Sequence, residues 1–179
     1  VVDIDPAEHQ KKTININTFI HADAKDFFNA CTLENITKPV QSQKWADTCY
    51  SWKNNWTVYQ KEYEKDDTGI NLYYFIEKLS DCMHSDSVVV SDAGSAYYVT
   101  SQGLKIKDKQ KYVTSGAQAD MGFTIPASVG VSFANNKKDV IGITGDGSFQ
   151  TNIQELQTIV HYNLPIKLFI WNNDGYLSI

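Results

Sequence analysis

Two glycine-containing polar turns, each placed directly after an apolar run, constrain the fold of this chain more than any other feature. The first is residues 145–148 (Gly-Asp-Gly-Ser), and the second is residues 172–176 (Asn-Asn-Asp-Gly-Tyr). Between them, residues 149–162 carry apolar side chains at helical spacing. Parallel strands joined by such a helix end at the same edge of a sheet. The sequence therefore predicts that the carboxylate of Asp146 and the carboxamide of Asn173 lie at one sheet edge.

The other apolar runs predict an α/β fold, with a parallel sheet and helices on both faces, because strand-like and helix-like patterns alternate along the chain. Short runs typical of buried strands are residues 88–90, 140–144 and 166–171, and an edge strand is predicted for residues 112–114. Apolar stripes with a helical period predict helices over residues 70–83, 122–134 and 149–162.

The first 65 residues have a different character. Residues 1–25 resemble the tail of an α/β unit, and residues 24–32 predict a short helix. Residues 33–43 are polar and contain a proline, which is typical of a linker. Residues 44–65 have helical composition and many aromatic side chains, which favour packing and surface cover over a binding site.

Composition excludes several classes of function. The net charge is −5 and no basic block is present, so nucleic acid is not expected as a partner. No apolar run approaches the roughly 18 residues that a membrane span needs, so no membrane partner is expected. The three cysteines, Cys31, Cys49 and Cys82, are too few and too widely spaced for a disulfide framework, which favours a reducing cytoplasm.

Both ends of the sequence lie in strand-like or apolar stretches, and the first residue is Val1. We therefore expect this chain to be a piece of a larger polypeptide.

The polar groups at the predicted sheet edge suit a metal ion and a diphosphate. Glycine lets a backbone approach a ligand closely, and the N–H groups that begin the helix after Ser148 can bind phosphate. Asp146 and Asn173 supply two oxygen ligands, and a loop carbonyl can give a third. Magnesium prefers this arrangement, in which phosphate oxygens and water complete the octahedron. Each turn taken alone is also ordinary turn chemistry, and only the two turns together at this spacing indicate such a site.

At this point the sequence resembles a known family. A Gly-Asp-Gly turn, 24 further residues and an Asn-Asn pair resemble the signature of thiamine diphosphate-dependent enzymes, in the branch of acetolactate synthases and 2-oxo acid decarboxylases. The resemblance covers most of the chain. Residues 1–25 resemble the C-terminal tail of a central α/β domain, residues 26–65 a linker and helix, and residues 66–179 the diphosphate- and magnesium-binding domain, truncated at its C-terminus.

The resemblance implies a set of site residues. Magnesium would be bound by Asp146, Asn173 and the backbone carbonyl of Gly175. Met121 would wedge the cofactor into its V shape, although a core methionine is the alternative, and the backbone of Ala119 would accept from the cofactor's amine. The full set of expected cofactor-binding residues is Ala93, Gly94, Ser95, Ala96, Ala119, Met121, Gly145, Asp146, Gly147, Ser148, Asn173, Gly175 and Tyr176.

No catalytic side chain is assigned within the chain. In the family that it resembles, a glutamate on the pyrimidine-binding domain, usually of a neighbouring subunit, activates the cofactor, and that domain is not part of this sequence. Glu155 is interpreted as a helix residue and His161 as a residue near a helix end. The resemblance also implies a homo-oligomer, a dimer or a tetramer. FAD is a further candidate cofactor that Asp3 and Asp5 could contact, with a simple strand-end turn as the alternative.

The implied reaction is decarboxylation of a 2-oxo acid such as pyruvate, followed by ligation of the resulting carbanion to a second carbonyl. Two alternatives stay open: a decarboxylase that does not ligate, and a cofactor-binding module without catalysis. Ser95-Ala96 replaces the Gln-His that is usual in acetolactate synthases and is closer to the decarboxylases. Ile179 stands where pyruvate decarboxylases place a catalytic glutamate, which favours ligation because a proton donor is missing there.

Overall fold

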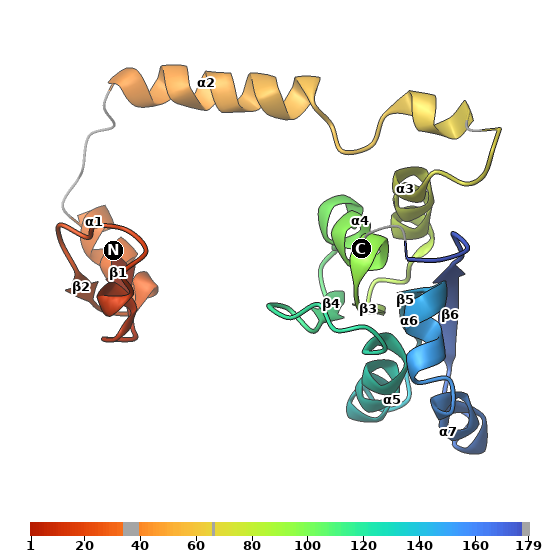
Figure 1. The fold of residues 1–179 in the computed structure, drawn as a ribbon. Coiled ribbons are helices and arrows are strands. Elements are labelled where there is room, and N and C mark those ends of the chain that lie inside the picture. The colour runs from red at the N-terminus through yellow and green to blue at the C-terminus, as the bar shows by residue number, and fades with distance from the viewer. Residues whose placement is uncertain (34–39, 66, 177–179) are drawn as a thin grey trace. The chain divides into compact units, whose positions relative to one another are not determined.

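The computed structural model describes residues 1–33, 40–65 and 67–176. By contact density the chain divides into two compact units, Val1–Trp56 and Thr57–Ile179, and each is described by itself. The boundary between them falls within the stretch that the sequence assigns to a linker and helix. Figure 1 shows the elements of both units with their labels.

The first unit has little sheet. Strand β1 (Val2–Asp3) pairs in parallel with β2 (Ile20–His21), and a single 3-10 turn, η1 (Glu8–Gln10), lies between them in sequence. Helix α1 (Ala24–Leu33) follows, as the sequence predicts.

Helix α2 (Val40–Asn55) corrects two predicted boundaries. It begins inside the predicted linker, of which residues 34–39 lie outside the described part of the chain, and it ends ten residues before the predicted helix end. The chain turns after Trp56, where the hydroxyl of Thr57 donates to the carbonyl of Tyr59 at 2.6 Å, and a 3-10 helix, η2 (Lys61–Lys65), follows. Trp45, Trp52 and Trp56 are 44–69% exposed. The rings of Trp45 and Trp52 pack edge to face, which fits the predicted role in surface packing.

The second unit is built on a parallel sheet. Within the described residues its strand order is β4-β3-β5-β6, and every neighbouring pair is parallel. The two inner strands are almost completely buried, and they are the strands that read as continuous apolar runs. The strands are β3 (Val88–Ser91), β4 (Lys111–Thr114), β5 (Val140–Gly145) and β6 (Ile166–Trp171).

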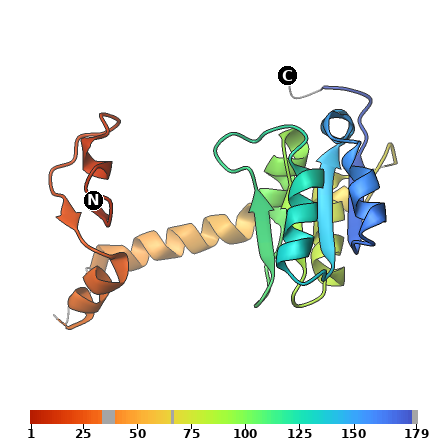
Figure 2. The ribbon, with the colours of Figure 1, turned by 90° about the horizontal axis from the view of Figure 1, so that it is seen from below.

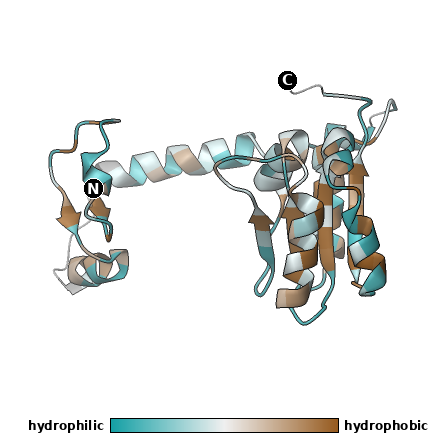
Figure 3. Ribbon diagram, turned by 60° about the horizontal axis from the view of Figure 1, so that its bottom comes forward, coloured by the Kyte–Doolittle hydropathy of each residue, from teal (hydrophilic) through white to brown (hydrophobic). Residues whose placement is uncertain are grey.

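Helices cover both faces of this sheet, and the predicted α/β class is confirmed (Figures 1 and 2). Helices α3 (Leu72–Cys82) and α4 (Gly94–Gly103) contact each other and cover one face, while α5 (Thr124–Ala134) and α7 (Glu155–His161) contact each other on the opposite face. Figure 3 shows the inner strands in the brown of hydrophobic residues, as a sheet buried between two helical layers requires.

Two helical predictions need correction. Helix α4 is not predicted by its sequence, Gly-Ser-Ala-Tyr-Tyr-Val-Thr-Ser-Gln-Gly, because that sequence has no clear apolar stripe. The single helix predicted over residues 149–162 is two helices, α6 (Asp146–Thr151) and α7. The break has a physical reason: Asn152 leaves the helix and its side-chain amide donates to the carbonyl of Gly122 at 2.8 Å.

The main core lies between the sheet and the α3–α4 layer. Its buried members come from both helices and from alternate positions on β3 and β5, because successive strand residues face opposite sides. They are Ile76, Met83, Val89, Ala96, Val99, Ile141 and Ile143.

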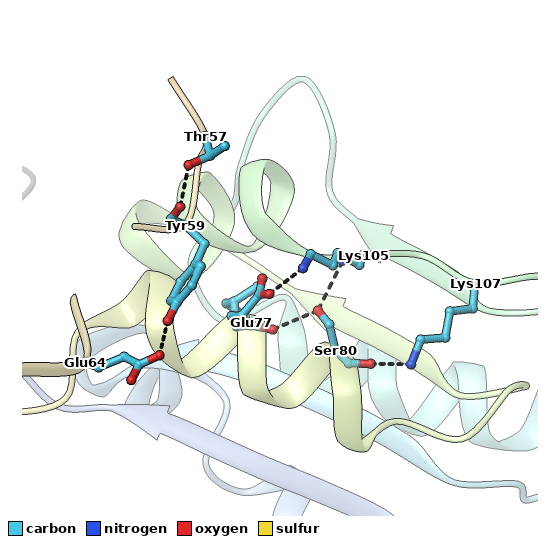
Figure 4. Close-up of polar contacts among 8 residues, drawn as sticks. Thr57, Tyr59, Glu64, Glu77, Ser80, Lys105 and Lys107 are labelled. Atoms are coloured by element: carbon cyan, nitrogen blue, oxygen red, sulfur yellow. Dashed lines mark hydrogen bonds and ion pairs between the residues drawn. The ribbon is translucent and has the colours of Figure 1, made fainter. Parts of the chain in front are cut away.

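Polar contacts fasten α3 to the segment that follows α4 (Figure 4). The fully buried hydroxyl of Ser80 donates to the carbonyl of Ile76 and accepts from the backbone N–H of Lys105 at 3.1 Å. The ammonium group of Lys107 donates a hydrogen bond to the carbonyl of Ser80 at 2.7 Å, and Lys105 forms an ion pair with Glu77. These bonds satisfy backbone groups where the chain leaves α4 and turns toward β4.

Candidate functional site

Three strands of the second unit end side by side, and each is followed by a polar residue. β3 leads into Asp92, β5 into Asp146 and β6 into Asn172. The register pairs Ser91 with Ile143 and Gly145 with Trp171, so β5 and β6 end level with each other and β3 ends two residues earlier. Ligands of open α/β sheets bind at this edge.

A cavity of about 640 Å³ opens there. It is lined by every residue of the expected cofactor-binding set except Ala119. Its remaining wall is mostly apolar and comes from the start of α3, from α4 and from β6. None of these residues is in the expected cofactor-binding set, although Asn172 belongs to the second turn: Ile70, Leu72, Phe75, Tyr98, Phe169, Ile170, Trp171 and Asn172.

Asp146 is half-buried and is the first residue of α6. Its Oδ1 accepts the backbone N–H of Gly147 at 2.9 Å, which fixes the carboxylate over the first turn of that helix. The N-cap position, Gly145, has no side chain to cap the helix, so capping is left to Asp146 and to any bound anion.

The second turn is held by its own asparagines. Oδ1 of Asn172 accepts the N–H of Asp174 at 3.1 Å, and Oδ1 of Asn173 accepts the N–H of Gly175 at 3.3 Å. Asp174 and Gly175 have φ values of +60° and +151°, which asparagine, aspartate and glycine tolerate best.

The two turns touch each other. A Cβ placed on Gly147 would lie 2.7 Å from Cε1 of the Tyr176 ring, so the ring packs directly over the Gly147 backbone. The pairing of the two turns that the sequence predicts is therefore present in space.

Met121 lines the cavity and is 39% exposed, so it is not a core residue. It belongs to the loop of residues 115–122, in which Ala119 and Gly122 both have positive φ, +52° and +79°. For Ala119 this backbone conformation is sterically unfavourable, and such residues cluster at binding sites. Ala119 itself does not line the cavity.

Asp92 is the polar residue of this edge that sequence reasoning missed. It is completely buried, and its Oδ2 accepts the hydroxyls of Ser148 at 2.5 Å and Thr144 at 2.7 Å. Its Oδ1 accepts the N–H of Ala93 at 2.7 Å. The one sequence signal is an acidic residue placed two positions after the apolar run of residues 88–90, where a buried carboxylate must find donors.

Comparison with known proteins agrees with this geometry. Residues 92–179 match the family described as "Thiamine pyrophosphate enzyme, C-terminal TPP binding domain". This part of the chain belongs to the thiamine pyrophosphate enzymes. The match begins at Asp92 and includes all three polar strand ends.

Relatives that match almost the whole chain include acetolactate synthase large subunits. The chain is 34% identical to the acetolactate synthase large subunit of Buchnera aphidicola subsp. Schizaphis graminum, over 97% of this chain and 30% of the relative. It is 32% identical to that of Porphyra purpurea and 30% identical to the isozyme 2 large subunit of Escherichia coli (strain K12), in each case over 96% of this chain. The chain thus spans about 30% of the length of the curated relatives it matches.

The residues present suit a thiamine pyrophosphate domain's metal and diphosphate. Among residues 1–33, 40–65 and 67–176, no three His, Cys, Asp or Glu side chains gather into a metal site. Asp146, Asn173 and the Gly175 carbonyl would offer one carboxylate and two neutral oxygens, which is too few for a protein cage. Magnesium held by a diphosphate needs few protein ligands, and the cavity of about 640 Å³ that Asp146 and Asn173 line has room for such a group.

Several other sequence interpretations can be followed in the structure. Oε2 of Glu155 accepts the hydroxyl of Thr158 in the first turns of α7, as a helix residue would. His161 is exposed at the end of that helix. Asp3 and Asp5 each accept a backbone N–H two residues ahead, at 2.8 Å, so the turn alternative is present and the flavin contact stays a prediction.

The interpretation of Ile179 lies outside the described residues. Of the helices that the structure describes, none combines the length and the apolar character needed to cross a membrane.

Proposed function

We propose that this chain is the diphosphate-binding part of an enzyme that depends on thiamine diphosphate and Mg²⁺ and decarboxylates a 2-oxo acid such as pyruvate. The remaining acyl unit is then joined to a second carbonyl, as the name of the acetolactate synthase relatives indicates for those proteins. The observation that supports this most is the cavity at the sheet edge, where Asp146 and Asn173 come from two turns that touch through Tyr176 and Gly147.

Within this proposal, each wall of the cavity has its own role. Asp146, Asn173 and the carbonyl of Gly175 hold Mg²⁺, and the backbones of residues 93–96 and 145–148 hold the diphosphate. Bound there, the cofactor supplies the carbon nucleophile and the electron sink for decarboxylation. Met121 and the apolar wall from β6 orient the rings and exclude water from them.

The residues that activate the cofactor are expected elsewhere. We propose a homo-oligomer, a dimer or a tetramer, in which a pyrimidine-binding domain supplies the activating glutamate. Cytoplasmic localisation is part of the proposal, since Cys31, Cys49 and Cys82 are all unpaired and two of them are exposed. FAD stays an expectation based on the resemblance alone.

The metal–diphosphate site has a direct test with a matched control. Asp146 follows the carboxyl end of β5 and Asp139 precedes its amino end, so the two aspartates bracket one strand. In the full-length protein, Asp146→Ala should abolish Mg²⁺-dependent binding of thiamine diphosphate in calorimetry. Asp139→Ala should leave it unchanged, because it loses only an exposed ion pair with Lys167. Unaltered affinity of the Asp146 variant would refute the site.

The reaction class is tested separately by mass spectrometry of what the enzyme makes from pyruvate alone. Acetolactate supports ligation. Free aldehyde without a ligated product would select the simple decarboxylase, the alternative that Ser95-Ala96 favours.

A further inference from the structure

The buried carboxylate of Asp92 gathers donors from distant parts of the second unit. It accepts the hydroxyls of Thr144, at the end of β5, and Ser148, in α6, and the N–H of Ala93, just before α4. Burying a carboxylate is costly unless its oxygens are hydrogen-bonded, and these bonds offset that cost. In both contacts the hydroxyl donates and a carboxylate oxygen accepts, so both hydroxyl protons are directed at Asp92.

Ser148 connects Asp92 to the loop of residues 115–122. Since its proton is donated to Asp92, its oxygen is left to accept, and it accepts the backbone N–H of Gly122 at 2.7 Å. The carbonyl of Gly122 in turn accepts the side-chain amide of Asn152 at 2.8 Å. The backbone N–H and C=O of Gly122 are thus both hydrogen-bonded, to the side chains of Ser148 and Asn152.

The close packing around Gly122 leaves no space for a side chain. A Cβ there would lie 2.8 Å from Cβ of Thr151 and 2.9 Å from Nδ2 of Asn152, and φ is +79°. The neighbouring residue is Met121, which lines the cavity. The position of the Met121 backbone is therefore set by α6, the helix that begins at Asp146.

We propose that Asp92, Ser148 and Gly122 form a positioning link that couples the diphosphate turn to the loop bearing Met121. The inference rests on the proposed function and goes further: Asp92 and the Ser148 hydroxyl are positioning residues for the ring-bearing part of the cofactor. The diphosphate itself meets the backbone of residues 145–148, which does not depend on the hydroxyl. The link thus serves binding of the bent cofactor as a whole, and it is not needed to bind its diphosphate.

Two probes separate these roles in the full-length protein with Mg²⁺: thiamine diphosphate and inorganic pyrophosphate. Ser148→Ala keeps the backbone N–H groups and removes the link. We expect its Kd for thiamine diphosphate to rise about tenfold, the effect of losing one well-placed hydrogen bond, with the Kd for pyrophosphate within about twofold. Ser148→Thr keeps a hydroxyl and should restore most of the affinity.

Controls keep the result interpretable. Ser132 is also fully buried, on α5, and its hydroxyl has no hydrogen-bond partner in the described structure, so Ser132→Ala should change neither Kd. Asn152→Ala removes the second hydrogen bond to Gly122 and leaves those of Asp92 in place. It should reproduce the selective loss of affinity for thiamine diphosphate even if Ser148→Ala folds poorly.

The outcomes divide cleanly. If Ser148→Ala and Asn152→Ala weakened the affinity for thiamine diphosphate and for pyrophosphate equally, or weakened neither, the link would be overturned. The proposed function would remain intact. Failure of the wild-type protein to bind thiamine diphosphate would overturn the proposed function itself, and the link with it.

Discussion

Tyr59 donates its phenolic hydrogen to the carboxylate of Glu64, and this bond ties the start of the second unit to η2 (Figure 4). The hydrogen bond, with the adjacent negative charge, raises the pKa of Tyr59 from 10.0 to about 12. Because the folded pKa is raised, the bond's contribution to stability is fully present below pH 10.0 and is lost as the pH rises toward about 12.

Ultraviolet absorbance of tyrosinate tests this at the residue scale. The difference between the titrations of the wild-type protein and Tyr59→Phe reports Tyr59 alone and should have its midpoint near pH 12. In Glu64→Gln the midpoint should fall toward the ordinary value, since the carboxylate charge is gone. A wild-type midpoint already at the ordinary value would mean that the Tyr59–Glu64 bond does not persist in solution.

At the same scale, sequence reasoning found the site residues whose chemistry is local. Asp146 and Asn173 stand in glycine-rich turns directly after apolar strands, and that context is readable from the sequence. Asp92 was missed because its meaning depends on Thr144 and Ser148, which lie 52 and 56 residues further along the chain. No local pattern carries a contact of that separation.

At the scale of elements, the inner strands and α3 were predictable because burial imposes a period on their sequences. α4 was not, because its helical state depends on its packing against α3, β3 and β5 and not on an apolar stripe of its own. The division of α6 from α7 depends on Asn152 binding the carbonyl of Gly122, a tertiary contact again. The boundaries of elements next to the site are thus set by the site's own hydrogen bonds.

The packing of α5 on β5 gives a prediction for this scale. A Cβ on Gly142 of β5 would lie 2.6 Å from Cδ2 of Leu168 and 3.0 Å from Cγ2 of Thr124, so Gly142→Ala should overpack the interface and destabilise the fold by about 1–3 kcal/mol. Gly130 of α5 has nothing within 4 Å of the position that a Cβ would take, so Gly130→Ala should be neutral or stabilising by up to about 1 kcal/mol. Urea unfolding measures both, and equal effects of the two substitutions would contradict the close approach.

At the scale of the whole molecule, the two units differ in what they contribute. All residues that line the cavity belong to the second unit, whereas the similarity to acetolactate synthases covers 97% of the chain and so includes the first. The first unit is therefore also similar in sequence to these relatives, while the residues proposed to bind the cofactor all lie in the second unit. Ligand binding should leave this division visible along the chain.

Hydrogen exchange of the full-length protein tests that expectation. Ligands stabilise the state that binds them, by about 2.7 kcal/mol at a ligand concentration of 100 times Kd. Thiamine diphosphate with Mg²⁺ should therefore slow amide exchange in residues 92–96, 115–122, 145–148 and 172–176. β1 and β2, whose residues do not line the cavity, serve as the internal reference. Asp146→Ala should remove the protection from all four segments together, because in the proposed function the metal and the diphosphate bind as one unit. Protection that survives in this variant, or that spreads evenly to β1 and β2, would contradict a single site at the sheet edge.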